Sequence, residues 1–191
     1  MKKTFVAAIL WLGAAGAVLA ASPRGWEFSA SAPQIYQAEV DHKVFHSGKA
    51  SGCIKSVGPA SATNFAVLTQ KIRAVNFRGR RWEMRGFIRT QDVDGWAGMW
   101  MRIDSRQGET LEFDNMQNRP IHGTTGWTAY SVKLNVPEAA DSINFGLLLS
   151  GKGEVWLDDV SFHDLGPVAA GAKERQKLRD PDPLLNLGFE E

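Results

Sequence analysis

Cysteine is nearly absent from this 191-residue chain, and neither sign of charge dominates it. Cys53 is the only cysteine, so no disulfide can form within the chain, and its small and β-branched neighbours predict a buried, unreactive thiol. The chain has 22 Lys and Arg against 21 Asp and Glu. A nearly neutral protein lacks the basic surface through which proteins bind nucleic-acid phosphates. We therefore expect no nucleic-acid partner.

Long apolar runs are also missing, except at the start of the chain. Lys2 and Lys3 precede a run of apolar and small residues from Phe5 to Ala21. This run is too short and too rich in Ala and Gly for a membrane span, so it predicts a signal peptide over residues 1–21 that is removed. The remaining 20 Lys and Arg face 21 Asp and Glu, a formal charge of −1. We expect an exported protein, periplasmic or secreted and not membrane-embedded, with one domain.

Motifs of catalytic sites are absent as well. The histidines show no metalloprotease spacing, and no G-x-S-x-G nucleophile elbow occurs. Asp92 and Asp94 are close together, but DVDGW is typical of a turn, in which Asp side chains bond to the local backbone. The sequence therefore predicts no catalytic residues and no enzymatic activity.

What is present is alternation of apolar and polar residues at period two, with almost no helical periodicity. Short strands separated by Gly, Asp, Asn and Pro clusters predict an all-β fold, an antiparallel sandwich or barrel. Strong patterns are RRWEMRGFIRT (80–90), GWAGMWMRID (95–104), WTAYSVKLNV (127–136), SINFGLLLS (142–150) and GEVWLDDVSFHD (153–164). Weaker ones lie at 26–30, 34–40, 49–56, 64–72 and 108–113.

Alternation also assigns side chains to faces, because neighbours on a strand point to opposite sides of the sheet. The apolar sets are expected in the core: Trp82, Met84 and Ile88 in the first strand, and Ala97, Met99, Met101 and Ile103 in the next. The opposite sets are expected on the outer face: Arg81, Glu83, Arg85, Phe87 and Arg89, then Trp96, Trp100 and Arg102.

The pattern stops near residue 165. The sandwich domain is therefore expected over 22–165, followed by a linker over 166–183 that is rich in Pro, Gly, Ala and charge. The chain ends in LLNLGFEE (184–191), whose apolar residues a disordered tail would not need. This segment is expected to be strand-like.

From Trp26 to Phe162 the sequence resembles the galactose-binding-like jelly roll, especially carbohydrate-binding modules of families 4 and 9. The similar pieces are GWEF, HSGKASGCIKS, RGRRWEMRGFIRT, GTTGWTAYSVKLNVP and GEVWLDDVSF. GWAGMWMRID and FDNMQNRPIHGTTGW also resemble a domain of bacterial proteins without an assigned role, some described as AraC-type transcriptional regulators. The resemblance implies an antiparallel jelly-roll β-sandwich.

The resemblance also bears on the C-terminal segment. Members of the family usually begin with an N-x-x-F-E strand before the first tryptophan, and NLGFEE (186–191) is similar to it. The segment could dock on its own molecule as the missing strand, cross to a second molecule in a homodimer, or begin a second domain that was lost. Docking, on its own or on a second molecule, is favoured over a lost domain because it would cover an unpaired sheet edge.

A structural calcium ion is implied by the same resemblance, since such modules often hold one between the first strand, the turn before the small-residue strand and the last strand. The implied ligands are Asp158 or Asp159, Glu190, and backbone carbonyls around His46 to Lys49. Calcium prefers six to eight oxygen ligands. Alternatively, Asp158 and Asp159 cap the strand end or pair with arginines.

Carbohydrate, or another polar and preferably anionic small ligand, is the expected partner on one sheet face. Such sites combine apolar walls with a few placed polar groups. The candidate residues are Phe87, Trp96, Trp100, Arg85, Arg89, Arg102, Lys133 and Asn144. The alternative is an ordinary solvated sheet covered by arginine stems. A competing function is an assembly module that recruits protein through the face or the C-terminal segment.

FDNMQNRPIHGTTGW (113–127) can be read in two ways. As a long connection between strands that end at Phe113 and begin at Trp127, it would be held by Asp114 and Asn115 and directed by Pro120. As a functional loop, it would supply the polar rim of the ligand face. The rim residues would be Asp114, Asn115, Arg119 and His122.

Overall fold

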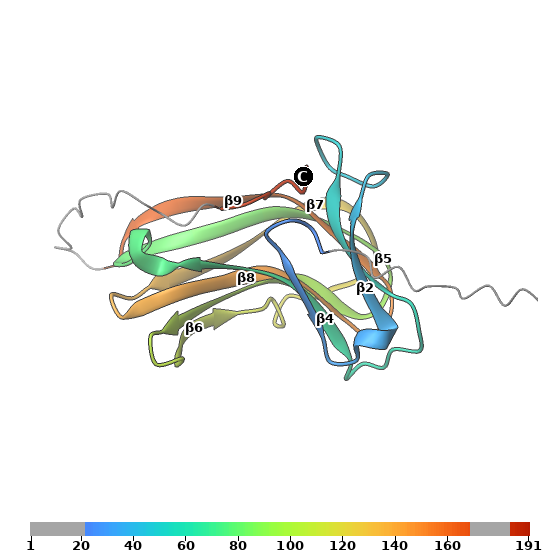
Figure 1. Cartoon of the computed structure of the whole chain (residues 1–191), viewed down its shortest axis with the longest axis horizontal. Coiled ribbons are helices and arrows are strands. Elements are labelled where there is room, and N and C mark those ends of the chain that lie inside the picture. The colour runs from blue at the N-terminus through green and yellow to red at the C-terminus, as the bar shows by residue number, and fades with distance from the viewer. Residues whose placement is uncertain (1–21, 169–183) are drawn as a thin grey trace, which may run out of the picture.

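A computed structural model describes residues 22–168 and 184–191 and shows an all-β antiparallel fold (Figure 1), which confirms the predicted fold class. The strands are β1 (Glu27–Ala30), β2 (Tyr36–Asp41), β3 (Ser51–Ser56), β4 (Phe65–Arg73), β5 (Arg80–Ser105), β6 (Thr110–Asp114), β7 (Ile121–Val136), β8 (Ala140–Ser150) and β9 (Glu154–Pro167). Two 3-10 turns, η1 (Pro33–Ile35) and η2 (Ala74–Asn76), join them. The expected signal peptide and most of the expected linker lie outside the described residues.

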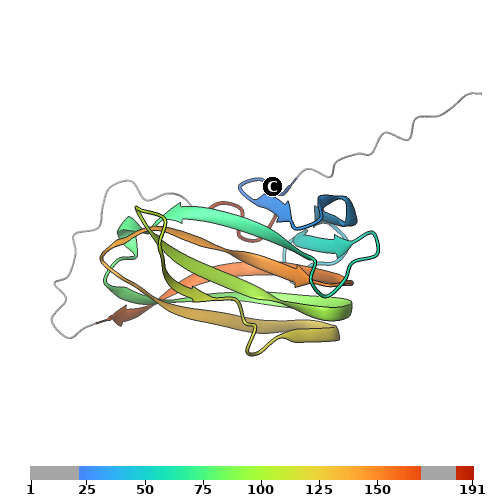
Figure 2. The same ribbon diagram turned by 90° about the horizontal axis from the view of Figure 1, so that it is seen from below.

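Strand β5 belongs to both layers of the sandwich. Residues 80–91 pair with β9 on one side and β7 on the other, whereas residues 96–105 pair with β8 and β6. One layer, the β9 sheet, is β7-β5-β9-β3-β2; the other, the β8 sheet, is β6-β5-β8-β4-β1. Figure 1 shows β9 above β8 and β6, and Figure 2 views the molecule from below, the side of the β8 sheet.

This arrangement corrects the expectation of two separate strands at 80–90 and 95–104. The DVDGW segment is a bend inside one strand of 26 residues, where Asp92 has φ 52 and Asp94 accepts the Lys152 backbone N–H. Pairing continues through the bend, because Val93 faces Gly123 and Ala97 faces Ile121 on β7. The bend carries the chain from one layer to the other.

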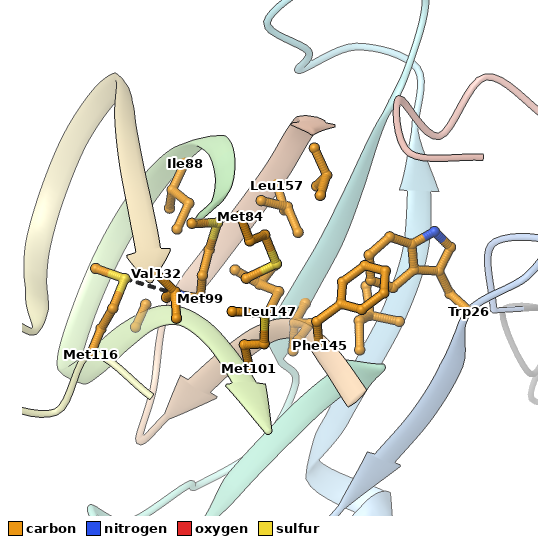
Figure 3. Packing of buried hydrophobic residues seen from close by; sticks show 14 of the residues in the cluster. Trp26, Met84, Ile88, Met99, Met101, Met116, Val132, Phe145, Leu147 and Leu157 are labelled. Atoms are coloured by element: carbon orange, nitrogen blue, oxygen red, sulfur yellow. Dashed lines mark hydrogen bonds between the residues drawn. The ribbon is translucent and has the colours of Figure 1, made fainter. Parts of the chain in front are cut away.

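The core lies between the layers and follows the predicted alternation. Met84, Ile88 and Leu157 come from the β9 sheet, and Met99, Met101 and Leu147 come from the β8 sheet (Figure 3). All six are at most 1% exposed. The expected inward set, Ala97, Met99, Met101 and Ile103, is fully buried. Trp82 is only partly buried and packs against this cluster beside Phe77, at 4.6 Å between ring centroids.

The C-terminal segment packs on the sandwich of its own chain. Phe189 is fully buried and stacks on Trp26, with ring centroids 4.8 Å apart. The Trp26 indole donates to the Asn186 carbonyl at 3.1 Å, and the Gln70 side chain bonds both the N–H and the carbonyl of Leu185. Residues 184–191 form an irregular turn rather than the expected strand.

Candidate functional site

The residues predicted for one ligand face are divided between two faces. Because β5 changes layer, the outer faces of its two halves belong to different sheets. The outer face of the β9 sheet, here the β9 face, carries Arg85, Phe87, Arg89 and Lys133. The outer face of the β8 sheet, here the β8 face, carries Trp96, Trp100, Arg102 and Asn144. The structure thus corrects the expectation of a single continuous face.

The β8 face extends over the strands β6, β5, β8, β4 and β1. One row across it reads Phe113 on β6, Arg102 on β5, Asn144 on β8 and Lys71 on β4. Its central side chains are nearly covered, Trp100 at 9% and Asn144 at 7% exposure, whereas Phe113 and Phe65 near its edges are 52% and 45% exposed. Exposed aromatic rings therefore border a more enclosed centre.

Asp104 organises the polar groups of the β8 face. Its carboxylate accepts hydrogen bonds from Arg102 Nε at 3.0 Å and from Asn144 Nδ2 at 2.8 Å, and it is 8% exposed. The network holds the Arg102 guanidinium and the Asn144 amide in fixed orientations next to Trp100. Sequence reasoning missed Asp104, although its period-two spacing from Arg102 places both on one face.

Trp100 has an unusual position within this face. The residue is only 9% exposed. Its indole N–H is buried as well, but it has no hydrogen-bond partner among the described residues. It lies between Gly98 and Arg102 along β5 and faces Gly146 across β8, so two of its neighbours have no side chain. A buried polar group without a partner costs stability, which makes this N–H a candidate donor to a ligand.

The connection between β6 and β7 is shorter than expected. β6 ends at Asp114, as predicted within one residue, but β7 begins at Ile121 rather than Trp127. Arg119 joins Asp114 through two hydrogen bonds, at 2.8 and 3.0 Å, and donates to the Ser131 carbonyl on β7. Burial would raise the pKa of Asp114, but the bonds from Arg119 and the Met116 N–H outweigh it and hold this pKa below its usual value.

The remaining rim candidates also serve the local backbone. Asn115 accepts the Gln117 N–H at 3.0 Å, and the His122 ring bonds the Gly95 carbonyl in the bend of β5. Asp114, Asn115, Arg119 and His122 therefore hold the chain between the layers. This supports the structural interpretation of the loop, and their role as a ligand rim stays a prediction.

On the β9 face, Glu83 gathers two of the predicted cations. Its side chain is 4% exposed, with Arg85 Nη2 at 2.6 Å and Lys133 Nζ at 3.3 Å from its oxygens. The Arg85 hydrogen bond is the main reason that the pKa of Glu83 falls to about 2, against a smaller opposing effect of burial. Arg85 and Lys133 are thereby engaged within the protein.

This ion cluster predicts a pH-dependent contribution to stability. A carboxylate whose pKa is lowered on folding stabilises the fold above its unfolded pKa and loses that effect as the pH falls towards about 2. Replacing Glu83 by Gln is expected to lower the free energy of unfolding by roughly 1–2 kcal/mol at pH 7, after allowance for exposed partners. The difference from wild type should vanish near pH 2.

Urea unfolding of wild type and Glu83→Gln across this pH range measures the effect. Glu109→Gln, in the exposed turn after β5, is the matched control that removes one carboxylate outside the cluster. A wild-type-to-variant difference that stays constant with pH would contradict the assignment.

Arg89 lies elsewhere on the β9 face, among aromatic rings. Its Cζ is 5.9 Å from the centroid of the Trp156 ring, on the paired position of β9. His46, from the loop between β2 and β3, stacks on Phe87 at 3.6 Å and meets Trp127 edge-on at 5.8 Å. Sequence reasoning missed the three ring partners. Trp156 could have been found by alternation with Val155 and Leu157, but no local pattern places His46 over a strand.

The residues implied for calcium meet at the loop of residues 46–49. Asp158 is buried beside a β-bulge at Asp159 (φ 51), and its carboxylate accepts the N–H groups of His46, Ser47 and Asp159. Both oxygens of Glu190 accept the Lys49 N–H. Burial raises the pKa of Asp158 despite these bonds.

The carboxylates of Asp158 and Glu190 thus accept hydrogen bonds from backbone amides. Asp159 likewise accepts from Ser47 Oγ and contacts His46 Nδ1, both at 2.7 Å. Across the described residues, no group of three or more His, Cys, Asp or Glu side chains could hold a metal ion. Calcium binding stays a prediction that a chelator titration tests, and the ion has no part in the function proposed below.

Two further observations concern the rest of the chain. Burial, together with nearby Glu39, raises the pKa of Cys53, which agrees with an unreactive thiol. Within residues 22–168 and 184–191, no helix is long and apolar enough to span a membrane.

Comparison with known proteins gives one curated relative and many structural ones. No protein-family model matches the chain. A protein of Bacillus subtilis (strain 168), described as an uncharacterized HTH-type transcriptional regulator, YbfP, is 39% identical over 168 residues, or 88% of this chain. The match spans 57% of the length of that relative, so this chain corresponds to little more than half of it.

Solved structures share the fold at low identity. The enzymatically active domain of tailspike protein 4 of bacteriophage CBA120 matches 75% of this chain and 20% of its own, with a TM-score of 0.60 and 14% identity. The CBM22-1 xylan-binding domain of Xyn10C from Paenibacillus barcinonensis matches 78% of this chain and 92% of its own, with a TM-score of 0.55 and 16% identity. At these identities the similarity establishes the jelly-roll fold alone.

Proposed function

We propose that this chain is an exported, non-catalytic module that binds carbohydrate on the β8 face. The observation that carries the proposal is Trp100, whose indole N–H is buried in the middle of an aromatic-bordered face and has no partner within residues 22–168 and 184–191. A sugar hydroxyl is a suitable acceptor for such an N–H. Export is inferred only from the leader-like sequence of residues 1–21.

The residues around Trp100 supply the other requirements of a sugar site. Rings at the border offer flat apolar surfaces for the carbon-bound faces of a pyranose, and the fixed Arg102 and Asn144 groups can bond hydroxyls. Trp96 and Trp100 are four residues apart on β5, about 13 Å at the usual strand rise. The face is therefore long enough for more than one sugar ring.

The comparisons are compatible with this proposal without carrying it. One structural neighbour is described as xylan-binding, and it shares the fold over most of its length. The regulator-like relative contains sequence beyond the matched region, so a shared ligand-sensing module joined to different partners would explain the match. A module of this kind needs no catalytic group of its own.

An assembly function is the second candidate and is less well supported. It would require the C-terminal segment to pair with another molecule, as in a swapped homodimer. In this single chain, Phe189 is instead buried against Trp26 of the same molecule. Ligand binding by a monomer is therefore preferred.

A glycan array probed with wild type, Trp100→Ala and Trp100→Phe tests the proposal. Wild type is expected to bind a subset of the array, and Trp100→Ala to lose at least about 10-fold in affinity, as for a buried aromatic contact. Trp100→Phe keeps a ring without the N–H and should lose a few-fold, close to the contribution of one hydrogen bond.

Arg106→Gln, in the exposed turn after β5, is the control with unchanged binding. Melting temperatures of all variants separate a binding defect from unfolding. Failure of wild type to bind any glycan, or full binding by a folded Trp100→Phe, would refute the proposed site.

A further inference from the structure

A second ligand site is suggested on the β9 face, on the opposite side of the molecule from Trp100. We propose that Arg89, which lies over the Trp156 ring, binds the carboxylate of a uronic-acid sugar. This site is independent of the β8 face, since the two faces belong to different sheets.

The Arg89 guanidinium is partly buried and forms no polar contact with the described residues. Its Nε is buried without a hydrogen-bond partner, and Arg89 forms no ion pair or hydrogen bond with any described residue. Its two terminal nitrogens have no hydrogen-bond partner among the described residues either, and they are not among the buried atoms. A cation that is partly withdrawn from water and forms no ion pair is stabilised by an added anion.

Unlike Arg89, other charged groups on this face have partners among the described residues. Arg85 and Lys133 share Glu83, Lys55 pairs with Glu39 at 2.6 Å, and His46 contacts Asp159. Asp41 accepts the Trp156 indole N–H at 2.8 Å. Each of these carboxylates has a partner of its own, and none of them reaches Arg89.

Aromatic rings lie under Arg89 and close to it on the β9 face. Trp156 pairs with Arg89 on β9, and Trp127 lies on β7 two residues before Ala129, which pairs with Phe87. Phe87, two residues away on β5, is covered by the stacked His46 ring. The guanidinium thus lies over one aromatic ring, and a cluster of three further rings, His46, Phe87 and Trp127, begins two residues away on β5.

This combination selects the ligand class. A planar guanidinium matches a carboxylate through two parallel hydrogen bonds, and flat rings favour a ligand with an apolar ring surface. A pyranose with a carboxylate at C5 has both features. A neutral hexose has the ring without the charge, whereas sulfate has the charge without the ring.

NMR titration of the protein with D-glucuronate, D-glucose and sulfate tests the site through the Arg Nε–Hε and Trp indole signals. Glucuronate should shift the signals of Arg89, Trp127 and Trp156, and it should bind at least about 10-fold more tightly than glucose, as a charge-assisted pair predicts. Arg89→Gln should abolish this preference, and Arg106→Gln should keep it.

Each other outcome overturns the proposal. Equal responses to glucose and glucuronate would remove the role of the carboxylate, and an equal response to sulfate would leave a general anion site without sugar recognition. If glucuronate changed only the NMR signal of Trp100, the binding site for the uronic acid would lie on the β8 face instead. Because Trp100→Phe should leave the Arg89 response intact, failure of this site and failure of the β8 site are distinguishable.

Discussion

Replacing Phe189 by Ala is expected to lower the free energy of unfolding by about 3–5 kcal/mol, the usual cost of removing a fully buried phenylalanine. The ring stacks on Trp26 and lies directly over Gly52, whose missing side chain makes room for it. Asn186 and Phe189 both adopt positive φ, 47 and 59, which costs free energy. Burial of the ring must outweigh that strain.

Chemical denaturation of wild type, Phe189→Ala and a deletion of residues 184–191 measures this contribution. The deletion should destabilise the protein at least as much as the point variant, since it also removes the bonds to Gln70 and Trp26. Leu185→Ala, at 43% exposure, is the matched control with a small effect. Unchanged stability of the deletion variant would show that the segment does not contribute to the fold, and a dimeric wild type would favour the swapped arrangement.

Met116→Ala is expected to lower the free energy of unfolding by about 2–5 kcal/mol. Met116 belongs to the loop between β6 and β7 and anchors this loop in the core. Met116 is fully buried at the end of the core far from Trp26 (Figure 3). Its sulfur accepts the Met99 backbone N–H at 3.3 Å, beyond the point where β6 stops pairing with β5. Truncation would therefore leave both a cavity and an unpaired backbone donor.

Met116→Leu separates these two effects. Leucine restores most of the volume but cannot accept the hydrogen bond. The free energy of unfolding should therefore fall by less than about 1.5 kcal/mol from the change of shape, and further by the cost of one unsatisfied N–H. Arg119→Ala, which removes the exposed ion pair of the same loop, should cost about 1 kcal/mol or less. If Met116→Ala destabilises no more than Arg119→Ala, the loop is not anchored through the core.

Much of the fold could be predicted from the sequence because strands report their faces locally. Alternation placed Ala97, Met99, Met101 and Ile103 inward, and all four are fully buried. The strand patterns agree with the observed elements, apart from the early start of β7 and the fusion of two strands into β5. The apolar ending LLNLGFEE likewise indicated a segment that packs rather than one that is solvated.

The candidate site could be predicted only in part. Its residue types were correctly placed on outer faces, but Trp100 and Arg89 were assigned to one face, and the structure puts them on two. Asp92, Asp94 and Gly95 look like a turn, since their sequence favours local bonds, and nothing local reveals that Val93 and Ala97 still pair with β7. The Trp156 ring under Arg89 comes from β9, and the His46 and Trp127 rings near Phe87 come from a loop and from β7, all distant in sequence.

The sequence by itself determined the all-β class, the inward and outward side chains of each strand, and the apolar character of the C-terminal segment, because these depend on side chains within a few residues of one another. Only the tertiary structure decided which layer each half of β5 joins, that Phe189 meets Trp26, and that Arg89 Nε and the Trp100 indole N–H lack hydrogen-bond partners in the part of the chain that the structure describes. Alternation defines a side relative to its own strand, and the bend at residues 92–96 changes the layer to which that side belongs.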